Sequence, residues 1–139
     1  MPIGLPDADI DLKFVQDCLR QAGALALAQC GKVTASLKAD HTPVTQADRQ
    51  VEDFLMGRIA ARYPAHTLLS EEGGAFKGND NLAWVIDPID GTRAYASGLP
   101  IWGISIGVLR GETPHAGGFY LPVTGEMYWG TCREAYYNE

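Results

Sequence analysis

Two aspartates stand three positions apart directly after the apolar run of residues 82–86. Held on a turn at the end of a strand, Asp87 and Asp90 would repel each other strongly wherever water screens them poorly. A divalent cation is the simplest compensation, and these carboxylates with the carbonyl of Ile89 form an oxygen donor set that suits Mg²⁺ or Mn²⁺. Asp, Pro and Gly in this order are equally typical of an ordinary turn, so both interpretations stand.

The residues after this pair could bind a phosphate. Gly91 lets the backbone approach a ligand closely, and Thr92 would begin a short helix over residues 92–96, whose first N–H groups attract anions. Arg93 is either a solvated residue of that helix, the partner of a nearby acid, or a group that selects an anionic substrate.

A second acidic pair, Glu71 and Glu72, follows the short apolar run of residues 66–70. Adjacent glutamates on a loop are most often simply solvated. If both apolar runs are strands of one sheet, the two acidic sets could converge at one sheet edge. Such a cluster would suit more than one metal ion, an arrangement that activates a water and stabilises the leaving oxygen of a phosphoryl transfer.

Asp48 has a structural and a chemical interpretation. Thr45 and Asp48 have the spacing of an acidic capping box at the start of a helix. Alternatively, Asp48 orients the Thr92 hydroxyl, or the nucleophilic water itself, as a general base. The two roles are compatible, because a capping residue is held in one position.

Two amphipathic helices are predicted to position these groups. Apolar side chains recur at helical spacing from Asp9 to Cys30, and again on one face of residues 44–64. Gly31 stands where a helix takes a left-handed C-cap, and Pro64 forces the second helix to stop.

Beyond Pro64 the apolar period changes from helical to two, which is typical of strands. Strands are predicted at residues 66–70, 82–87, 101–109, 115–121 and 126–131, the last three as an antiparallel meander. Residues 73–81 read as an exposed connector. We therefore expect an α+β fold in which two N-terminal helices pack on a mainly antiparallel sheet.

Composition restricts the class of protein. A chain of 139 residues that is 46% hydrophobic suits one globular domain. A net charge of −6 argues against nucleic acid and anionic membranes as partners. No apolar stretch approaches the ~18 residues of a membrane span, and no signal peptide is evident, which predicts a cytoplasmic protein. Three widely spaced cysteines indicate neither a disulfide framework nor a thiolate metal site.

Taken together, three segments resemble the signature motifs of the inositol monophosphatase family, a group of magnesium-dependent, lithium-sensitive phosphomonoesterases. They are WVIDPIDGT at residues 84–92, SEEGG at 70–74 and PVTQADRQVE at 43–52, and they occur in the family's order. The resemblance implies an αβαβα layered sandwich. It also implies that a metal-activated water hydrolyses a small phosphorylated metabolite of the inositol monophosphate or histidinol phosphate type.

The resemblance also implies a role for each candidate residue. The metal ligands would be Glu71, Asp87, Asp90 and the carbonyl of Ile89, and the complete fold would hold two or three Mg²⁺ ions, with Mn²⁺ as an alternative. Asp48 and Thr92 would activate the water, while Glu72 would orient a ligand or a metal-bound water. The N–H groups of Gly91 and Thr92 would hold the phosphate. Arg93 follows the signature threonine, where the histidinol-phosphatase-like branch of the family often carries an arginine, and would contact the substrate.

Members of that family are considerably longer and supply one further metal-binding aspartate from their second half. We therefore expect residues 1–139 to form a single N-terminal α+β domain of a phosphatase fold, without the C-terminal α/β part. The family commonly forms dimers, so a homo-oligomer or a completing chain is expected. The alternative is a truncated, catalytically incomplete metal- and phosphate-binding module that associates through its exposed sheet face.

Overall fold

The structure is a computed structural model that describes residues 10–32, 36–37 and 43–138. Its helices are α1 (Leu12–Gln29), α2 (Gln46–Arg62) and α3 (Thr92–Ala96). Its strands are β1 (Ser36–Leu37), β2 (Pro43–Val44), β3 (Thr67–Ser70), β4 (Ala75–Phe76), β5 (Leu82–Asp90), β6 (Gly103–Arg110), β7 (Thr113–Leu121), β8 (Glu126–Thr131) and β9 (Ala135–Tyr137). The predicted helix start at Asp9 lies outside the described residues.

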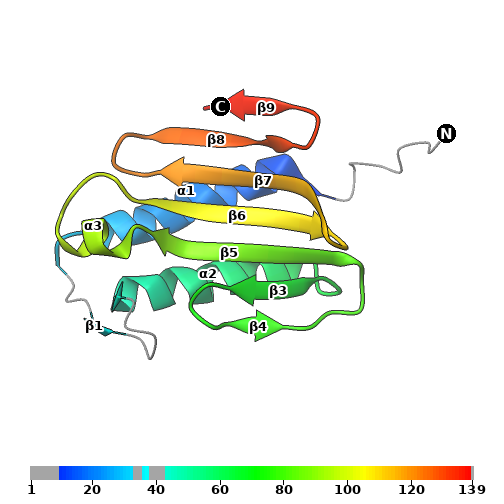
Figure 1. The fold of residues 1–139 in the computed structure, drawn as a ribbon, viewed down its shortest axis with the longest axis horizontal. Coiled ribbons are helices and arrows are strands. Elements are labelled where there is room, and N and C mark those ends of the chain that lie inside the picture. The colour runs from blue at the N-terminus through cyan, green and yellow to red at the C-terminus, as the bar shows by residue number, and fades with distance from the viewer. Residues whose placement is uncertain (1–9, 33–35, 38–42, 139) are drawn as a thin grey trace.

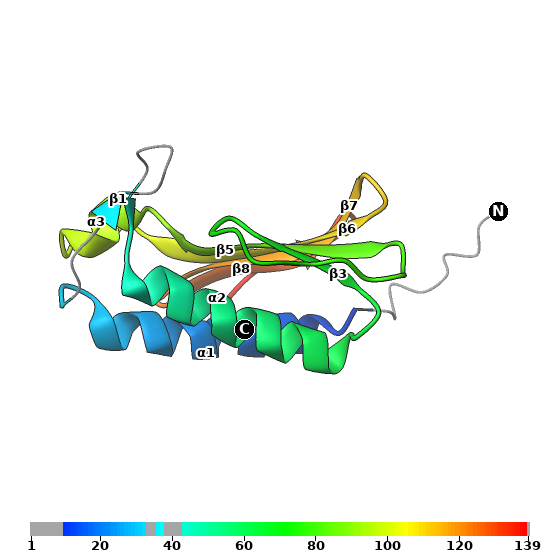
Figure 2. The same ribbon diagram turned by 90° about the horizontal axis from the view of Figure 1, so that it is seen from below.

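One sheet and two long helices make up two layers. The seven strands of the sheet follow the order β4-β3-β5-β6-β7-β8-β9, and β1 pairs separately with β2 (Figure 1). Strands β3 and β5 are parallel, while the other neighbours in this sheet are antiparallel. Figure 2 shows α1 and α2 side by side on the same face of the sheet. The predicted α+β class, with two helices on a mainly antiparallel sheet, is confirmed.

Helix α1 forms where local signals and burial agree. The carboxylate of Asp11 accepts hydrogen bonds from the N–H groups of Lys13 and Phe14, which caps the first turn. Its buried stripe against the sheet includes Val15, Leu19, Ala22 and Ala26. Beyond the C-terminus, Gly31 takes a φ of 76°, the left-handed conformation that was expected there.

Helix α2 begins with the predicted capping box. The Thr45 hydroxyl accepts from the N–H of Asp48, and the Asp48 side chain accepts from the N–H of Thr45. Val51, Leu55 and Ile59 are fully buried on one face of the helix. The helix ends at Arg62, just before Pro64, whose ring cannot continue an α-helix.

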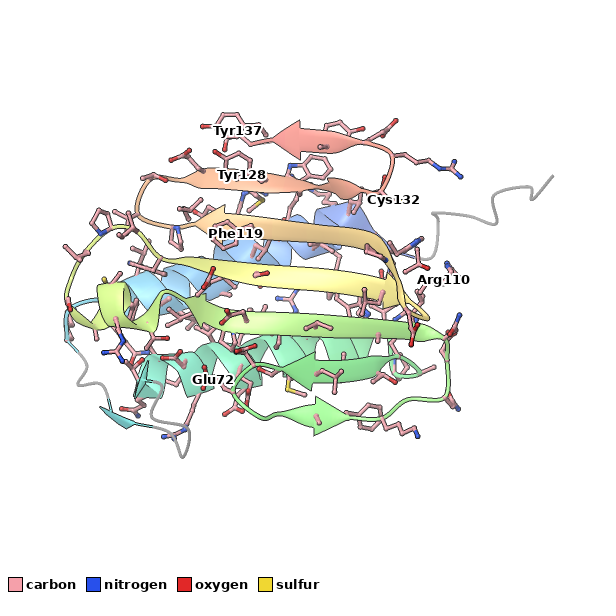
Figure 3. All side chains as sticks on the ribbon, viewed as in Figure 1. Glu72, Arg110, Phe119, Tyr128, Cys132 and Tyr137 are labelled. Carbon is pink, nitrogen blue, oxygen red and sulfur yellow. The ribbon has the colours of Figure 1, made fainter. Side chains whose placement is uncertain are left out.

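The two faces of the sheet differ in what covers them. The helix-facing side chains of β5 and β6, among them Trp84 and Ile106, are almost completely buried. On the opposite face, Val85 is 40% and Tyr128 is 46% exposed. Figure 3 shows Phe119, Tyr128 and Tyr137 in a row across β7, β8 and β9 on the sheet. An apolar surface therefore remains open in this chain.

The structure corrects two predictions about the edges of the sheet. Residues 73–81, expected to be a connector, contain the short strand β4, which pairs with β3 after a turn in which Ser70 N–H donates to the carbonyl of Gly74. Strand β9 was not predicted at all, although it pairs with β8. Both are two or three residues long, too short for an alternating pattern to reveal, and form because a neighbouring strand offers its backbone groups.

No helix in the described part of the chain is long and apolar enough to cross a membrane. Its cysteines are free thiols: Cys18 is buried, Cys30 is partly buried and Cys132 is exposed.

Candidate active site

The parallel pair β3 and β5 brings the two acidic sets together. Ser70 lies opposite Ile86 in the register, and the N–H of Glu71 donates to the carbonyl of Ile86 at 2.9 Å. Because side chains alternate along a strand, Asp87 projects to the face away from the helices, and Glu71 comes directly after the end of β3 beside it. The predicted convergence at one sheet edge is therefore present in the backbone arrangement.

Strand β5 continues through the second aspartate, which corrects the prediction of a strand that ends at residue 87 with Asp90 on the turn after it. Asp87 pairs with Ser105 and Asp90 with Gly103, with a register shift between them. Pro88 lies inside the shift, where it removes one backbone donor from the ladder. The irregularity bends the end of β5 and leaves the Asp90 side chain exposed.

The surroundings of Asp87 disfavour its ionised form. Burial raises its pKa to about 7, and the neighbouring carboxylates of Asp90, Glu71, Glu72 and Asp48 act in the same direction. Its Oδ1 atom is buried and has no hydrogen-bond partner in the described structure. A carboxylate in this position needs either a proton or a cation.

Asp48 is placed quite differently, because both its oxygens are engaged. Its Oδ2 accepts from the N–H of Thr45 at 2.8 Å and from the Thr45 hydroxyl at 2.7 Å. Its Oδ1 accepts from the Thr92 hydroxyl at 3.0 Å. The capping and chemical interpretations of Asp48 thus coexist: the cap holds the carboxylate that contacts Thr92.

The short helix α3 carries the predicted phosphate-binding residues. Gly91 precedes it with a φ of 92°, and a Cβ atom built there would lie 3.0 Å from the carbonyl oxygen of Ile101. Glycine therefore suits this position for both conformation and space. The Thr92 hydroxyl also lies 3.1 Å from the carbonyl of Ile89, the predicted metal-ligating oxygen. Arg93 is exposed on α3.

The donor chemistry around Asp87 fits a hard divalent cation. Four further carboxylates lie within electrostatic reach of Asp87, whose buried Oδ1 has no hydrogen-bond partner among the described residues. Among the described residues, however, no group of three His, Cys, Asp or Glu side chains stands at the spacing of a preformed metal site. Glu71, Asp87 and Asp90 lie at one end of the sheet, but their side chains are not close enough together to coordinate one ion in this conformation.

Glu52 contacts this region but was not among the predicted site residues. The Glu52 side chain of α2 accepts a hydrogen bond at 3.3 Å from the N–H of Gly74, at the end of the turn that carries Glu71 and Glu72. Figure 3 shows Glu72 at that turn, between α2 and the end of β3. The spacing of Asp48 and Glu52, four residues apart on one helix, was the available signal for a shared orientation.

The chain is similar in sequence to one family of proteins and to individual members with phosphatase names. The inositol monophosphatase family matches residues 9–139. Histidinol-phosphatase from Chlorobaculum parvum is 34% identical over 120 residues, 85% of this chain and 46% of that protein. Fructose-1,6-bisphosphatase/inositol-1-monophosphatase from Aquifex aeolicus is 37% identical over 93 residues, 67% of this chain and 35% of that protein.

A solved structure extends the relationship to the fold. The extragenic suppressor protein suhB from Bartonella henselae superposes with a TM-score of 0.86 at 26% identity, covering 91% of this chain and 51% of that chain. The two sequence relatives are named as phosphatases. The chain belongs to the inositol monophosphatase family, and it spans less than half the length of these two relatives.

Proposed function

We propose that this chain contributes the cation-binding and water-activating groups for hydrolysis of a small phosphomonoester. The observation that carries the proposal is the convergence of carboxylates around Asp87, whose buried Oδ1 has no hydrogen-bond partner in the part of the chain that the structure describes. Anionic clusters of this kind suit divalent cations with oxygen ligands. Membership of a family with phosphatase relatives supports the same reaction class.

Glu71, Asp87, Asp90 and the carbonyl of Ile89 would hold Mg²⁺, or Mn²⁺ in its place. When bound, the cation lowers the pKa of a coordinated water and neutralises charge on the phosphoryl group. Two or three such ions belong to the complete family fold, and this chain supplies part of their ligands. The partly buried Glu72 would orient one of these ligands.

Asp48 and Thr92 would accept the proton of the attacking water. The Thr92 hydroxyl donates its own proton to Oδ1 of Asp48, so its lone pairs are free to accept from a water. As the water oxygen attacks phosphorus, its proton would pass to Thr92 Oγ1 while the Thr92 proton moves to Asp48. The bond between phosphorus and the ester oxygen would break in the same step, and the leaving alkoxide would take up a proton from solvent water to depart as the alcohol. The Thr45 bonds to Oδ2 hold Asp48 in the orientation that this transfer needs.

The backbone N–H groups of Gly91 and Thr92 would bind the phosphate oxygens, and Arg93 would contact an anionic or polar part of the substrate. The substrate would be of the inositol monophosphate or histidinol phosphate type, in keeping with the names of the relatives. We further propose a cytoplasmic protein that works as a homodimer or with a completing chain. Neither nucleic acid nor a membrane is a proposed partner.

Phosphate release from inositol 1-phosphate and histidinol phosphate tests the proposal. The assay uses this chain with Mg²⁺ or with a chelator, and the Asp87→Asn variant serves as the control. We expect release that requires Mg²⁺ and is lost in the variant. Absence of release even where calorimetry detects Mg²⁺ binding would contradict catalysis by this chain.

That second result would favour the alternative, a catalytically incomplete module that binds cation and phosphate and associates through the open sheet face. The exposed side chains of Leu69, Val85 and Tyr128 on that face favour association. Light scattering on the same samples would show whether the chain self-associates.

A further inference from the structure

The turn between β3 and β4, residues 71–74, is tied down at both ends. At its start, Glu71 N–H donates to the carbonyl of Ile86 in β5. At its end, Gly74 N–H donates to the Glu52 carboxylate in α2 at 3.3 Å. Glu71 and Glu72 lie between these two anchors, so the position of their side chains depends on both.

Close packing at Gly74 supports the second anchor independently. A Cβ atom built on Gly74 would lie 2.5 Å from Met56 Sδ and 2.9 Å from Cδ and Oε1 of Glu52. Such distances are too short for a side chain, so the backbone of the turn lies directly against the α2 surface formed by Glu52 and Met56. A hydrogen bond and a tight contact thus join the same two elements.

Helix α2 reaches the candidate site at two points. Asp48 contacts Thr92 at the start of α3, and Glu52, one turn further along the same helix, contacts Gly74. One rigid helix therefore connects the groups proposed to activate water with the turn that carries the glutamates.

We infer that Glu52 is a positioning residue, which fixes the turn carrying Glu71 and Glu72 by accepting the Gly74 N–H. This role depends on the proposed function in one respect: Glu71 and Glu72 must bind a divalent cation or orient its ligands. The useful property of Glu52 is its acceptor oxygen rather than its charge. A glutamine keeps that oxygen, whereas an alanine removes it.

The test measures Mg²⁺ and Mn²⁺ affinity by calorimetry for the chain and four variants. Glu52→Ala is expected to weaken binding about tenfold, the lower end of the usual effect of groups that support metal ligands. Glu52→Gln is expected to change affinity by less than about threefold, because the acceptor is kept. Asp53→Ala, which removes the same charge from an exposed neighbour on α2, is the matched control and should bind like the parent chain.

Gly74→Ala approaches the same contact from the other side. Its methyl group would displace the flexible ends of Glu52 and Met56, so it should weaken cation binding as Glu52→Ala does. Equal affinity of Glu52→Ala and the parent chain would overturn the inference. So would equal weakening in Glu52→Gln and Glu52→Ala, or in Asp53→Ala, because charge alone would then explain the loss.

A second readout does not depend on cation binding. Hydrogen exchange of the Glu71 and Gly74 amides, measured by NMR in chelator, should accelerate in Glu52→Ala and remain slow in Glu52→Gln. If the parent chain binds no cation, the proposed ligand set fails, and this exchange measurement alone decides the role of Glu52. Unchanged exchange in Glu52→Ala would then refute the positioning role.

Discussion

The start of α2 holds the buried Asp48 and the end of β5 holds the partly buried Asp87, but the two carboxylates differ in how many hydrogen bonds they accept. Asp48 accepts three hydrogen bonds from Thr45 and Thr92. Asp87 has a buried oxygen with no hydrogen-bond partner among the residues that the structure describes, and its pKa is raised to about 7. The first carboxylate is stabilised by the protein itself, whereas the second is destabilised as an anion.

The contrast separates two kinds of functional residue. A carboxylate that protein donors satisfy is held in one orientation and contributes to folding. A carboxylate that the protein leaves unsatisfied costs stability in its ionised form, and a cation or a proton relieves that cost. We therefore expect substitutions at Asp48 and Asp87 to change different properties.

The largest effect should come from Asp87→Asn. Loss of this anionic ligand should weaken Mg²⁺ binding by at least about 100-fold, beyond the usual effect of groups outside the coordination shell. The metal-free variant should unfold at the same temperature as the parent chain or higher at pH 8, because a buried charge is removed. Calorimetry and thermal unfolding measure the two properties. Glu112→Gln, an exposed acid in the β6–β7 turn, is the control, and equal Mg²⁺ affinity in both variants would contradict the prediction.

Asp48→Ala should instead destabilise the fold. It removes the Asp48 half of the capping box and leaves the Thr45 N–H and the Thr92 hydroxyl without their acceptor, at a cost of about 2 to 3 kcal/mol in the free energy of unfolding. Urea denaturation in the presence of chelator measures this cost. A variant as stable as the parent chain would show that the three hydrogen bonds contribute little.

Asp48→Asn separates the structural role of Asp48 from its proposed chemical role. Its amide oxygen can keep the bonds from Thr45, so the expected loss is only about 1 kcal/mol. An amide does not take up a proton at neutral pH, so Mg²⁺-dependent phosphate release should nevertheless fall sharply. Stable protein with unchanged turnover would argue against Asp48 as the proton acceptor.

The stability of the metal-free chain should also depend on pH, by less than the loss expected for Asp48→Ala. The pKa of Asp87 rises from an unfolded value near 3.8 to about 7 in the folded chain. Between these values the folded state binds a proton that the unfolded state has lost, so stability should fall as pH rises from about 4 to 7. Allowing for solvent screening, we expect about 1 to 2 kcal/mol across this window. Thermal unfolding in chelator measures the fall, which should be absent in Asp87→Asn; equal slopes in the two chains would contradict it.

Thr92→Val should have a small effect on stability, of the same size as Asp48→Asn. It removes one donor to Asp48 and replaces it with a methyl group of similar size, for a loss of about 1 kcal/mol. Thr92→Ser keeps the hydroxyl and is the control. Urea denaturation of both variants measures the difference, and a loss of the same size in each would attribute the effect to packing.

Local signals predicted the helices and the acidic motifs well. The capping box of Thr45 and Asp48, the left-handed Gly31 and the short helix after Gly91 were all foreseen from spacing and residue type. Each depends on hydrogen bonds or backbone conformations within a few residues of the chain. Such features form largely independently of what packs against them.

Edge strands and long-range contacts were harder to foresee. Strands β4 and β9 carry no readable pattern, and the continuation of β5 to Asp90 depends on its pairing with Gly103 in β6. The contact between Glu52 and Gly74 joins residues 22 positions apart. Pairings of this kind depend on which elements the whole fold places side by side.

The order of the helices and strands, and the side chains available for chemistry, follow from short-range patterns in the sequence. The sequence places acids after Ser70 and Ile86 and a cap at Thr45, because helix periodicity, strand alternation and turn preferences act over short distances. The packing of the whole chain places β3 and β5 in parallel, so that Glu71 stands beside Asp87. It also satisfies both oxygens of Asp48, while Oδ1 of Asp87 has no hydrogen-bond partner among the described residues. The physical reason is that burial and charge–charge interaction are properties of the packed chain, and no local spacing encodes how much water each carboxylate retains.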